Sequence, residues 1–459
     1  MAAPRILTAR SAAWKTLNRC TIFKHDTAEV LSRLLSCTDR PAQATDIVFG
    51  VIRNRAAIDH ILKNCSALDS DRVKPSQWNL LRIGVYELVY APKTADYAIL
   101  NEAVQLAQQA GSKKGAGFIN AVLRNVQRAI EDRQASPEAK RIRRTVPQTP
   151  EFGCLFNDAI MPDPDTEAVP YFSAAFSIPQ SLIAEWLKTF GKEKTRAICF
   201  ASNRSPSVIA QPNTLHTTTV DWIDRLGDED IAIEQRADEF RIRRGGKINT
   251  SRRWREGLFF IQDTTAANAI KTLSPMPDWT VLDVCAAPGG KCMASAVRMR
   301  DQGVILASDA DAERLKKVRE NAQRMRLQSI EIVPPSQLEK TVRKLKRLDA
   351  IVLDVPCSNT GVLARRVEAR WRWTPEAVAN LRRTQQQLLH QAAALAHRKT
   401  KILYSTCSIQ PEENGEQIQA FLAQHNRFTL LTEKLTLPAL QSPDAFDHDG
   451  GYAAVLQSL

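Results

Sequence analysis

The chain has 459 residues, which is too long for one ordinary hydrophobic core and predicts two to four domains. Apolar residues form 44% of it and charged residues 25%, as in soluble globular proteins, and no apolar run approaches the length of a membrane span, so we expect no membrane partner. The 63 Lys and Arg residues exceed the 50 Asp and Glu residues and give a net charge of +13, which favours a polyanionic partner such as a nucleic acid.

Nine cysteines are spread along the chain without a Cys-x-x-Cys pair. No secretory signal is evident, so we expect reduced thiols in a cytoplasmic protein rather than a disulfide framework. Their spacing relative to histidine suggests no zinc site, and we expect no metal. The first 25 residues contain no acid, as in transit peptides, but the apolar spacing from Ile6 to Leu17 favours the first helix of a domain.

The pattern of residues 1–133 predicts helices throughout, and the apolar stretch from Leu80 to Val89 is the strongest of them. Further helices are predicted from Ala98 to Ala110 and from Phe118 to Ile130. These segments predict an all-α helix bundle with its own core. Residues 134–170 are rich in proline and predict a linker or an extended insertion.

Residues 171–257 mix short helical and strand-like segments and predict a small α+β unit. Basic residues bunch here and elsewhere, which favours a nucleic-acid track, although a solvated basic surface gives the same pattern. The bunches are Lys140 to Arg144, Arg241 to Lys247, Arg252 to Arg255, Lys340 to Arg347 and Arg365 to Arg372.

Residues 258–459 alternate between apolar strands and helices, which predicts an α/β domain with a parallel sheet covered on both faces. In such a sheet the ligands lie at the carboxyl ends of the strands. The predicted strands are Thr280 to Val284, Val304 to Ser308, Ile330 to Val333, Ala350 to Leu353 and Lys401 to Ser405, and the predicted helices are Lys291 to Arg298, Ala312 to Met325 and Pro375 to Ala396.

A glycine-rich turn, AAPGG, follows the first of these strands. It gives the backbone room to approach a ligand and exposes helix N-terminal amides, although such turns also serve packing. Asp309 follows the next strand, where an acid accepts the hydroxyls of a ribose or caps a helix. The two features together predict a nucleotide-like cofactor.

Cys357 in LDVPCSNTG and Cys407 in LYSTCSIQPEENG each open a polar turn directly after a buried strand. A single cysteine is usually a small core residue, and the others in the chain are interpreted in that way. These two differ because strand ends are where α/β enzymes hold reactive groups. Asp354 lies three residues before the first of them, so we predict a thiol nucleophile beside a cofactor.

From residue 262 onward the chain resembles the RNA cytosine-C5 methyltransferases. The resemblance lies in DVCAAPGGK, DVPCSNTG and STCSIQPEEN. Residues 6–133, with FGVIRN, LLRIGVYELVY, ILNEAVQLA and FINAVLRNVQR, resemble the NusB-like RNA-binding domain that is fused to one branch of these enzymes. That branch comprises the bacterial 16S ribosomal RNA methyltransferases of the Sun/Fmu type, so the resemblance covers nearly the whole chain.

The resemblance implies a Rossmann-like domain that uses S-adenosylmethionine to methylate carbon 5 of a cytosine in RNA. Cys407 is then the nucleophile that adds to carbon 6, and Cys357 assists its elimination. Asp354 holds the cytosine edge and Lys291 orients Asp354. The residues implied in cofactor binding are Cys285, Ala286, Ala287, Pro288, Gly289, Gly290, Lys291, Asp309 and Asp354.

The implied partner is RNA, with small-subunit ribosomal RNA favoured over transfer RNA by the NusB-like segment, and we expect a monomer. One departure stands out, because relatives usually carry an acid near the end of the third strand and this chain has Pro334 and Pro335 there. The alternative to an enzyme is therefore an RNA-binding ribosome assembly factor with weakened catalysis.

Overall fold

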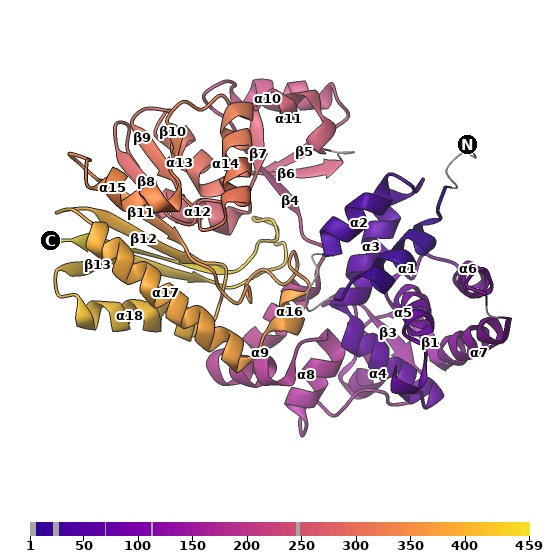
Figure 1. The fold of residues 1–459 in the computed structure, drawn as a ribbon. Coiled ribbons are helices and arrows are strands. Elements are labelled where there is room, and N and C mark those ends of the chain that lie inside the picture. The colour runs from indigo at the N-terminus through magenta and orange to yellow at the C-terminus, as the bar shows by residue number, and fades with distance from the viewer. Residues whose placement is uncertain (1–5, 22–26, 69, 112, 245–247) are drawn as a thin grey trace. The chain divides into compact units, whose positions relative to one another are not determined.

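The computed structural model describes residues 6–21, 27–68, 70–111, 113–244 and 248–459 (Figure 1). Lys247, at the end of one predicted basic bunch, lies outside them. The chain divides into two compact units. Unit 1 comprises residues 1–204 and 366–373, and unit 2 comprises residues 205–365 and 374–459.

Unit 1 begins with seven helices, in agreement with the predicted bundle. The central helix is α5, which is buried from Leu80 to Val89. Its buried charges are paired, as the low-dielectric interior requires: Glu87 accepts from Arg10 at 2.5 Å, and Arg82 binds Asp59 at 2.7 Å. The helices are α1 Ala9–Arg19, α2 Thr27–Leu35, α3 Pro41–Arg53, α4 Arg55–Ser66, α5 Pro75–Tyr90, α6 Asp96–Gln109 and α7 Lys113–Ala129.

The segment predicted as a linker or extended insertion instead contributes to a three-stranded antiparallel sheet of order β1-β3-β2. Its strands are β1 Ile130–Ala135, β2 Thr145–Pro147 and β3 Gly153–Phe156. This segment forms a sheet for two local reasons. All four residues of β3 are buried, which favours a central strand, and Pro147 lies at the end of the edge strand β2, where a missing backbone donor is tolerated. Helices α8 Ala168–Phe176 and α9 Gln180–Asn203 then complete this part of unit 1.

Residues 366–373 return to unit 1 from much later in the chain and contain the short helix α16 Ala369–Arg372. Arg370 is fully buried there, and its guanidinium donates to the backbone oxygens of Arg53 and Ser202, each at 2.9 Å. Burial of Arg370 removes it from the predicted basic track, so this part of the bunch from Arg365 to Arg372 is structural.

Unit 2 begins with a four-stranded antiparallel sheet of order β5-β6-β4-β7. The sheet and its helices have the predicted α+β character, but residues 171–204 of the segment predicted as this unit belong to unit 1. Trp222 and Phe259 lie at the centre of its core. Arg241 and Arg243 both form ion pairs with Glu234, so the basic bunch here is partly neutralised. The elements are β4 Val208–Pro212, α10 Thr219–Gly227, β5 Ala232–Arg236, β6 Glu239–Arg244, α11 Arg252–Arg255 and β7 Phe259–Ile261.

The rest of unit 2 is built on a seven-stranded sheet of order β10-β9-β8-β11-β12-β14-β13. Five strands are parallel: β8 Thr280–Asp283, β9 Val304–Ala307, β10 Ile330–Ile332, β11 Ala350–Asp354 and β12 Lys401–Thr406. The last two, β13 Phe428–Thr436 and β14 Gly451–Ser458, pair antiparallel and extend the predicted parallel sheet into a mixed one.

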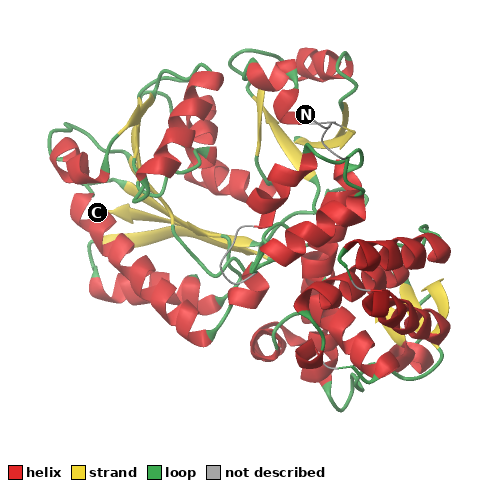
Figure 2. Ribbon diagram, turned by 45° about the vertical axis from the view of Figure 1, so that its right-hand side comes forward, coloured by secondary structure: helices red, strands yellow, loops and turns green. Residues whose placement is uncertain are grey.

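Helices cover both faces of this sheet, as Figure 2 shows. Successive strand residues point to opposite sides, so apolar strands present a face to the helices on each side. In β11, Val352 packs in the core beneath α12, α13 and α14, whereas Ile351 and Leu353 pack in the opposite core, beneath α17 and α18. These helices are α12 Thr264–Leu273, α13 Gly290–Arg298, α14 Ala312–Arg324, α17 Pro375–Leu395 and α18 Gly415–Gln424, with the short α15 Leu338–Val342 on the second side. The predicted fold class is thereby confirmed.

Across the described parts of the chain, no helix combines the length and the apolar character needed to cross a membrane.

Candidate active site

The three motifs singled out in the sequence meet at the carboxyl ends of β8, β11 and β12. These strands are adjacent and parallel, with β11 between the other two. The register places Asp354, the last residue of β11, opposite Ser405 of β12. The three strands end at the same edge of the sheet, so the residues that follow them surround one site.

The two predicted cysteines lie side by side, with 3.2 Å between the Sγ atoms of Cys357 and Cys407. The Cys407 thiol also donates to Oδ1 of Asn359 at 3.2 Å. Gly361 joins the two loops, because its amide donates to the backbone oxygen of Cys407 at 2.9 Å. A Cβ at Gly361 would lie 2.6 Å from the backbone of Gly450, so only glycine permits this approach.

The two thiols differ in access. Cys357 is only 7% exposed, whereas Cys407 is half-buried and lines a pocket. The hydrogen-bonding contact with Cys407, burial and the charge of Glu413 raise the pKa of the Cys357 thiol well above its usual range. Cys357 is therefore a protonated, shielded thiol at neutral pH, and Cys407 is the one that a ligand in the pocket can reach.

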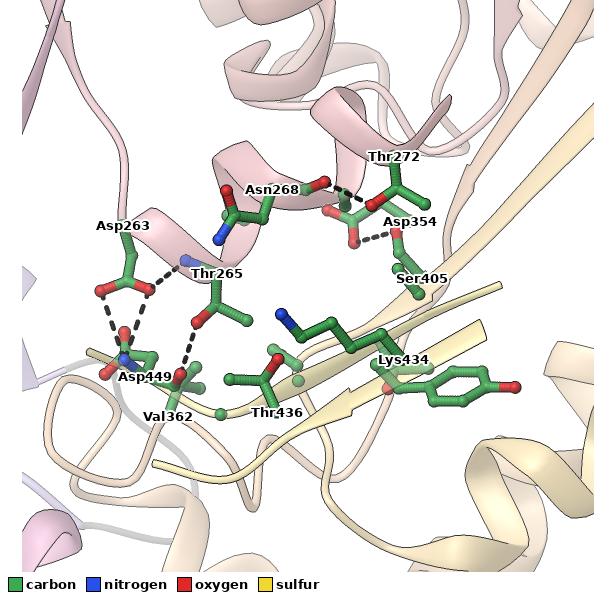
Figure 3. Close-up of a pocket in the computed structure, with 18 of the residues that line it drawn as sticks. Asp263, Thr265, Asn268, Thr272, Asp354, Val362, Ser405, Lys434, Thr436 and Asp449 are labelled. Atoms are coloured by element: carbon green, nitrogen blue, oxygen red, sulfur yellow. Dashed lines mark hydrogen bonds between the residues drawn. The ribbon is translucent and has the colours of Figure 1, made fainter. Parts of the chain in front are cut away.

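The pocket beside Cys407 is shown in Figure 3. Asp354 forms an ion pair with Lys291 at 2.7 Å and accepts from the Ser405 hydroxyl at 3.2 Å, so its carboxylate is held in one orientation. The side chains of Asn268 and Lys434 point toward the same space (Figure 3). The lining residues include Asp263, Thr265, Asn268, Lys291, Asp354, Thr406, Cys407, Lys434, Thr436, Asp449 and Gly450.

Lys291 is charged in this setting. Burial works to lower its pKa, but the charge and hydrogen bond of Asp354, with smaller contributions from Asp283 and Cys407, together raise it. Burial also raises the pKa of Asp283, to about 7, and the hydrogen bond from Cys292 offsets part of this rise. The site therefore holds a fixed ammonium, Lys291, beside the partly exposed carboxylate of Asp354 and near the buried carboxyl group of Asp283.

The glycine turn from Cys285 to Gly290 lies between β8 and α13. Gly289 has φ +109°, a conformation that side chains rarely adopt, and α13 begins at the next residue with its amides exposed. Asp309, two residues after β9, accepts from the backbone amides of Ala287 and Asp311, each at 3.0 Å, and Arg314 lies 3.9 Å from it. The Oδ2 atom that binds Ala287 retains a lone pair, so the turn and this acid suit the backbone approach and the ribose contact of a nucleoside cofactor.

Pro334 and Pro335 follow β10, which pairs with β9. They start a short 3-10 turn, Pro335–Gln337. Neither residue has a side-chain acceptor, so Pro334 and Pro335 offer no acidic contact to a ligand at this edge of the sheet.

Glu413 is a functional candidate that the sequence did not single out. It is 0% exposed and belongs to the 3-10 turn Pro411–Glu413 after β12. Its carboxylate accepts from the Ser358 amide at 2.9 Å, from the Ser408 hydroxyl at 2.6 Å and from Nε2 of Gln385 at 3.0 Å. Because Ser358 and Ser408 each follow one of the two cysteines, Glu413 ties both thiol loops together.

A second group fixes the outer wall of the pocket. Arg365, four residues after Gly361, binds Asp449 at 2.5 Å and Asp263 at 3.1 Å. Arg365 belongs to one of the predicted basic bunches, but its charge is neutralised by these two carboxylates. Asp263 and Asp449 were missed because they come from distant segments that only the fold brings together.

Within the described residues, no group of His, Cys, Asp or Glu side chains is arranged to hold a metal ion. The fold and this site define a Rossmann-like methyltransferase with an added helical domain and a small ferredoxin-like domain. Three family models match the chain: NusB over residues 7–128, the ferredoxin-like domain of RsmF/B-like methyltransferases over 178–240, and 16S rRNA methyltransferase RsmB/F over 270–452.

The probable ribosomal RNA small subunit methyltransferase B of Synechocystis sp. is 31% identical to this chain over 386 residues, covering 83% of this chain and 80% of that protein. Its namesake from Bacillus subtilis is 30% identical over 389 residues, covering 84% and 80%. The chain therefore belongs to the RsmB/F family of S-adenosylmethionine-dependent methyltransferases. Among solved structures, PH0851 shares the fold with a TM-score of 0.73 at 20% identity, covering 100% of this chain and 99% of that one.

Proposed function

We propose that the protein methylates carbon 5 of a cytosine in small-subunit ribosomal RNA, through a covalent bond between Cys407 and the base. One observation carries this proposal: Cys407 lines the same pocket as Lys291 and Asp354, and Cys357 lies 3.2 Å behind it. Family membership supports the RNA substrate, since the RsmB/F family model is described as a 16S rRNA methyltransferase.

Carbon 5 of cytosine is a weak nucleophile, which is why the chemistry needs a thiol. The Cys407 thiolate adds to carbon 6, and the electrons of the C5–C6 double bond make carbon 5 nucleophilic. Asp354 accepts a hydrogen bond from the exocyclic amino group of the ring, and its orientation is fixed by Lys291 and Ser405. The base is unpaired or flipped out when it enters the pocket, because a stacked cytosine hides its ring faces.

The glycine turn from Cys285 to Gly290, with Lys291, Asp309 and Asp354, would hold S-adenosylmethionine. When bound, this cofactor supplies the methyl cation that carbon 5 accepts. The proton on carbon 5 then passes to Cys357 in its minor thiolate form, which its raised pKa makes rare at neutral pH but strongly basic, and the C6–S bond breaks to return Cys407 as a thiolate. Cys357 is placed to assist this second step because its Sγ lies 3.2 Å from that of Cys407.

The test is nucleoside mass spectrometry of RNA treated with the full chain and isotope-labelled S-adenosylmethionine. We expect labelled 5-methylcytidine in naked 16S ribosomal RNA or in small-subunit particles, and none in transfer RNA. Label found only in transfer RNA would show that transfer RNA, and not ribosomal RNA, is the substrate. Label on another atom, or cofactor binding without methylation, would refute the proposed reaction and favour the assembly-factor alternative.

A further inference from the structure

A polar groove runs between α6 and α7 of unit 1. Each helix contributes residues spaced three, four or seven apart, which places them on one helical face. Ala116 and Gly117 leave the floor of the groove open, and a Cβ added at Gly117 would meet nothing within 4 Å. The lining residues are Tyr97, Leu100, Asn101, Val104 and Gln108 of α6 and Ala116, Gly117, Asn120, Arg124 and Gln127 of α7.

Some of the polar side chains that line the groove have no protein partner. Within the part of the chain that the structure describes, Asn101, Asn120 and Arg124 make no side-chain hydrogen bond or ion pair, whereas Gln127 donates to Asp96 at 2.9 Å. Tyr97 is 78% exposed, which is unusual for a large aromatic residue on a folded helix. Amides present a donor and an acceptor together, as the edges of nucleic acid bases require, and an exposed ring offers a stacking surface.

The electrostatics of the groove favour an anion. Helix α7 carries Lys114, Arg124 and Arg128 but no acid. The two acids of α6 are already neutralised, since Asp96 binds Arg133 at 2.7 Å and Glu102 binds Arg10. A net positive groove with free amides and an exposed tyrosine is complementary to RNA.

We propose that this groove binds an unpaired segment of the RNA substrate. Tyr97 stacks on a base, Asn101 and Asn120 bind base edges, and Arg124 binds a phosphate. An unpaired segment fits better than a duplex, because the deep, narrow major groove of A-form RNA hides its base edges from side chains. The proposal rests on RNA being the substrate, as proposed above, and adds where unit 1 holds it.

The experiment uses the full chain and a fluorescent, mixed-sequence, single-stranded oligoribonucleotide that carries 4-thiouridine for photocrosslinking. We expect Tyr97→Ala and Arg124→Glu each to weaken binding about tenfold, since one stacked base contributes roughly 1 to 3 kcal/mol. Tyr97→Phe keeps the ring and should retain wild-type affinity. Lys63→Glu, an equal charge reversal at an exposed position on α4, is the matched control and should change binding little.

Crosslinked peptides from wild-type protein should include α6 or α7, and a duplex of the same sequence should crosslink there weakly. Equal affinities for wild type, Tyr97→Ala and Arg124→Glu would overturn the proposal, as would crosslinks confined to other peptides. The result is separable from catalysis: methylation without crosslinks in α6 or α7 refutes the groove alone. Crosslinks in these helices without any methylation would instead refute the proposed reaction.

Discussion

The loops after β11 and β12 have cysteines in equivalent positions, but the two cysteines differ in their access to the pocket. Each follows a buried parallel strand, and each brings a cysteine to the same edge of the sheet. Only Cys407 faces the pocket, whereas Cys357 is shielded and has Glu413 near it. Access and local charge, rather than residue type or position on the strand, are therefore what distinguish the proposed nucleophile, Cys407, from the residue proposed to assist release, Cys357.

The nucleophile should be the less replaceable of the two thiols. Cys407→Ala removes the group that activates carbon 5, so methylation should fall by about a thousandfold or more. No protein–RNA adduct should survive denaturation, whereas cofactor binding measured by calorimetry should match wild type. Methylation near the wild-type rate would show that Cys407 is not the nucleophile.

Loss of the shielded thiol should leave attack intact and impair release. Cys357→Ala should accumulate a denaturation-resistant adduct on a gel, with multiple turnover reduced by about a hundredfold, as expected for loss of a proton-transfer group. Adding Cys407→Ala to this variant should abolish the band. Wild-type turnover by Cys357→Ala, with no adduct, would show that the role belongs to another residue.

Glu413 should set the pH at which release occurs. The raised pKa keeps Cys357 protonated at neutral pH, so the fraction able to accept a proton rises as pH rises. Glu413→Gln removes a negative charge that contributes, after the contact with Cys407 and burial, to the raised pKa of Cys357, and we expect the release profile to shift to lower pH. Glu412→Gln, the neighbouring acid, is the matched control. A slower rate without a shift would make Glu413 a purely structural residue.

The smallest expected effect concerns the cofactor rather than the thiols. Pro335→Asp restores an acid near the end of β10 and should tighten S-adenosylmethionine binding about fivefold, below the roughly 1.5 to 3 kcal/mol typical of a charged hydrogen bond. Calorimetry should show this gain without any change in adduct formation. Unchanged affinity would mean that the adenosine contact comes from another residue.

Much of this arrangement could be predicted from the sequence because it depends on local signals. Apolar runs followed by polar turns located the strand ends that carry Gly289, Cys357 and Cys407. The approach of the two thiols also follows from topology, since adjacent parallel strands end at one edge.

The remainder depends on packing between distant segments. Lys434 reaches the pocket from β13, an edge strand whose residues are largely exposed and lack a continuous apolar run. Glu413 lies in a polar turn of a kind that is usually solvated, and only the fold shows that it is buried and accepts four hydrogen bonds from three residues, Ser358, Ser408 and Gln385. The apolar β3 was hidden among prolines in the same way.

The central claim, that Cys407 attacks the base, is tested most directly by trapping. RNA that carries 5-fluorocytidine at the modified position cannot lose a proton from carbon 5, so the covalent intermediate should persist after methyl transfer. Peptide mass spectrometry of the trapped wild-type chain should place the RNA on Cys407. Attachment at Cys357, or the absence of any adduct under conditions that methylate ordinary RNA, would contradict the account.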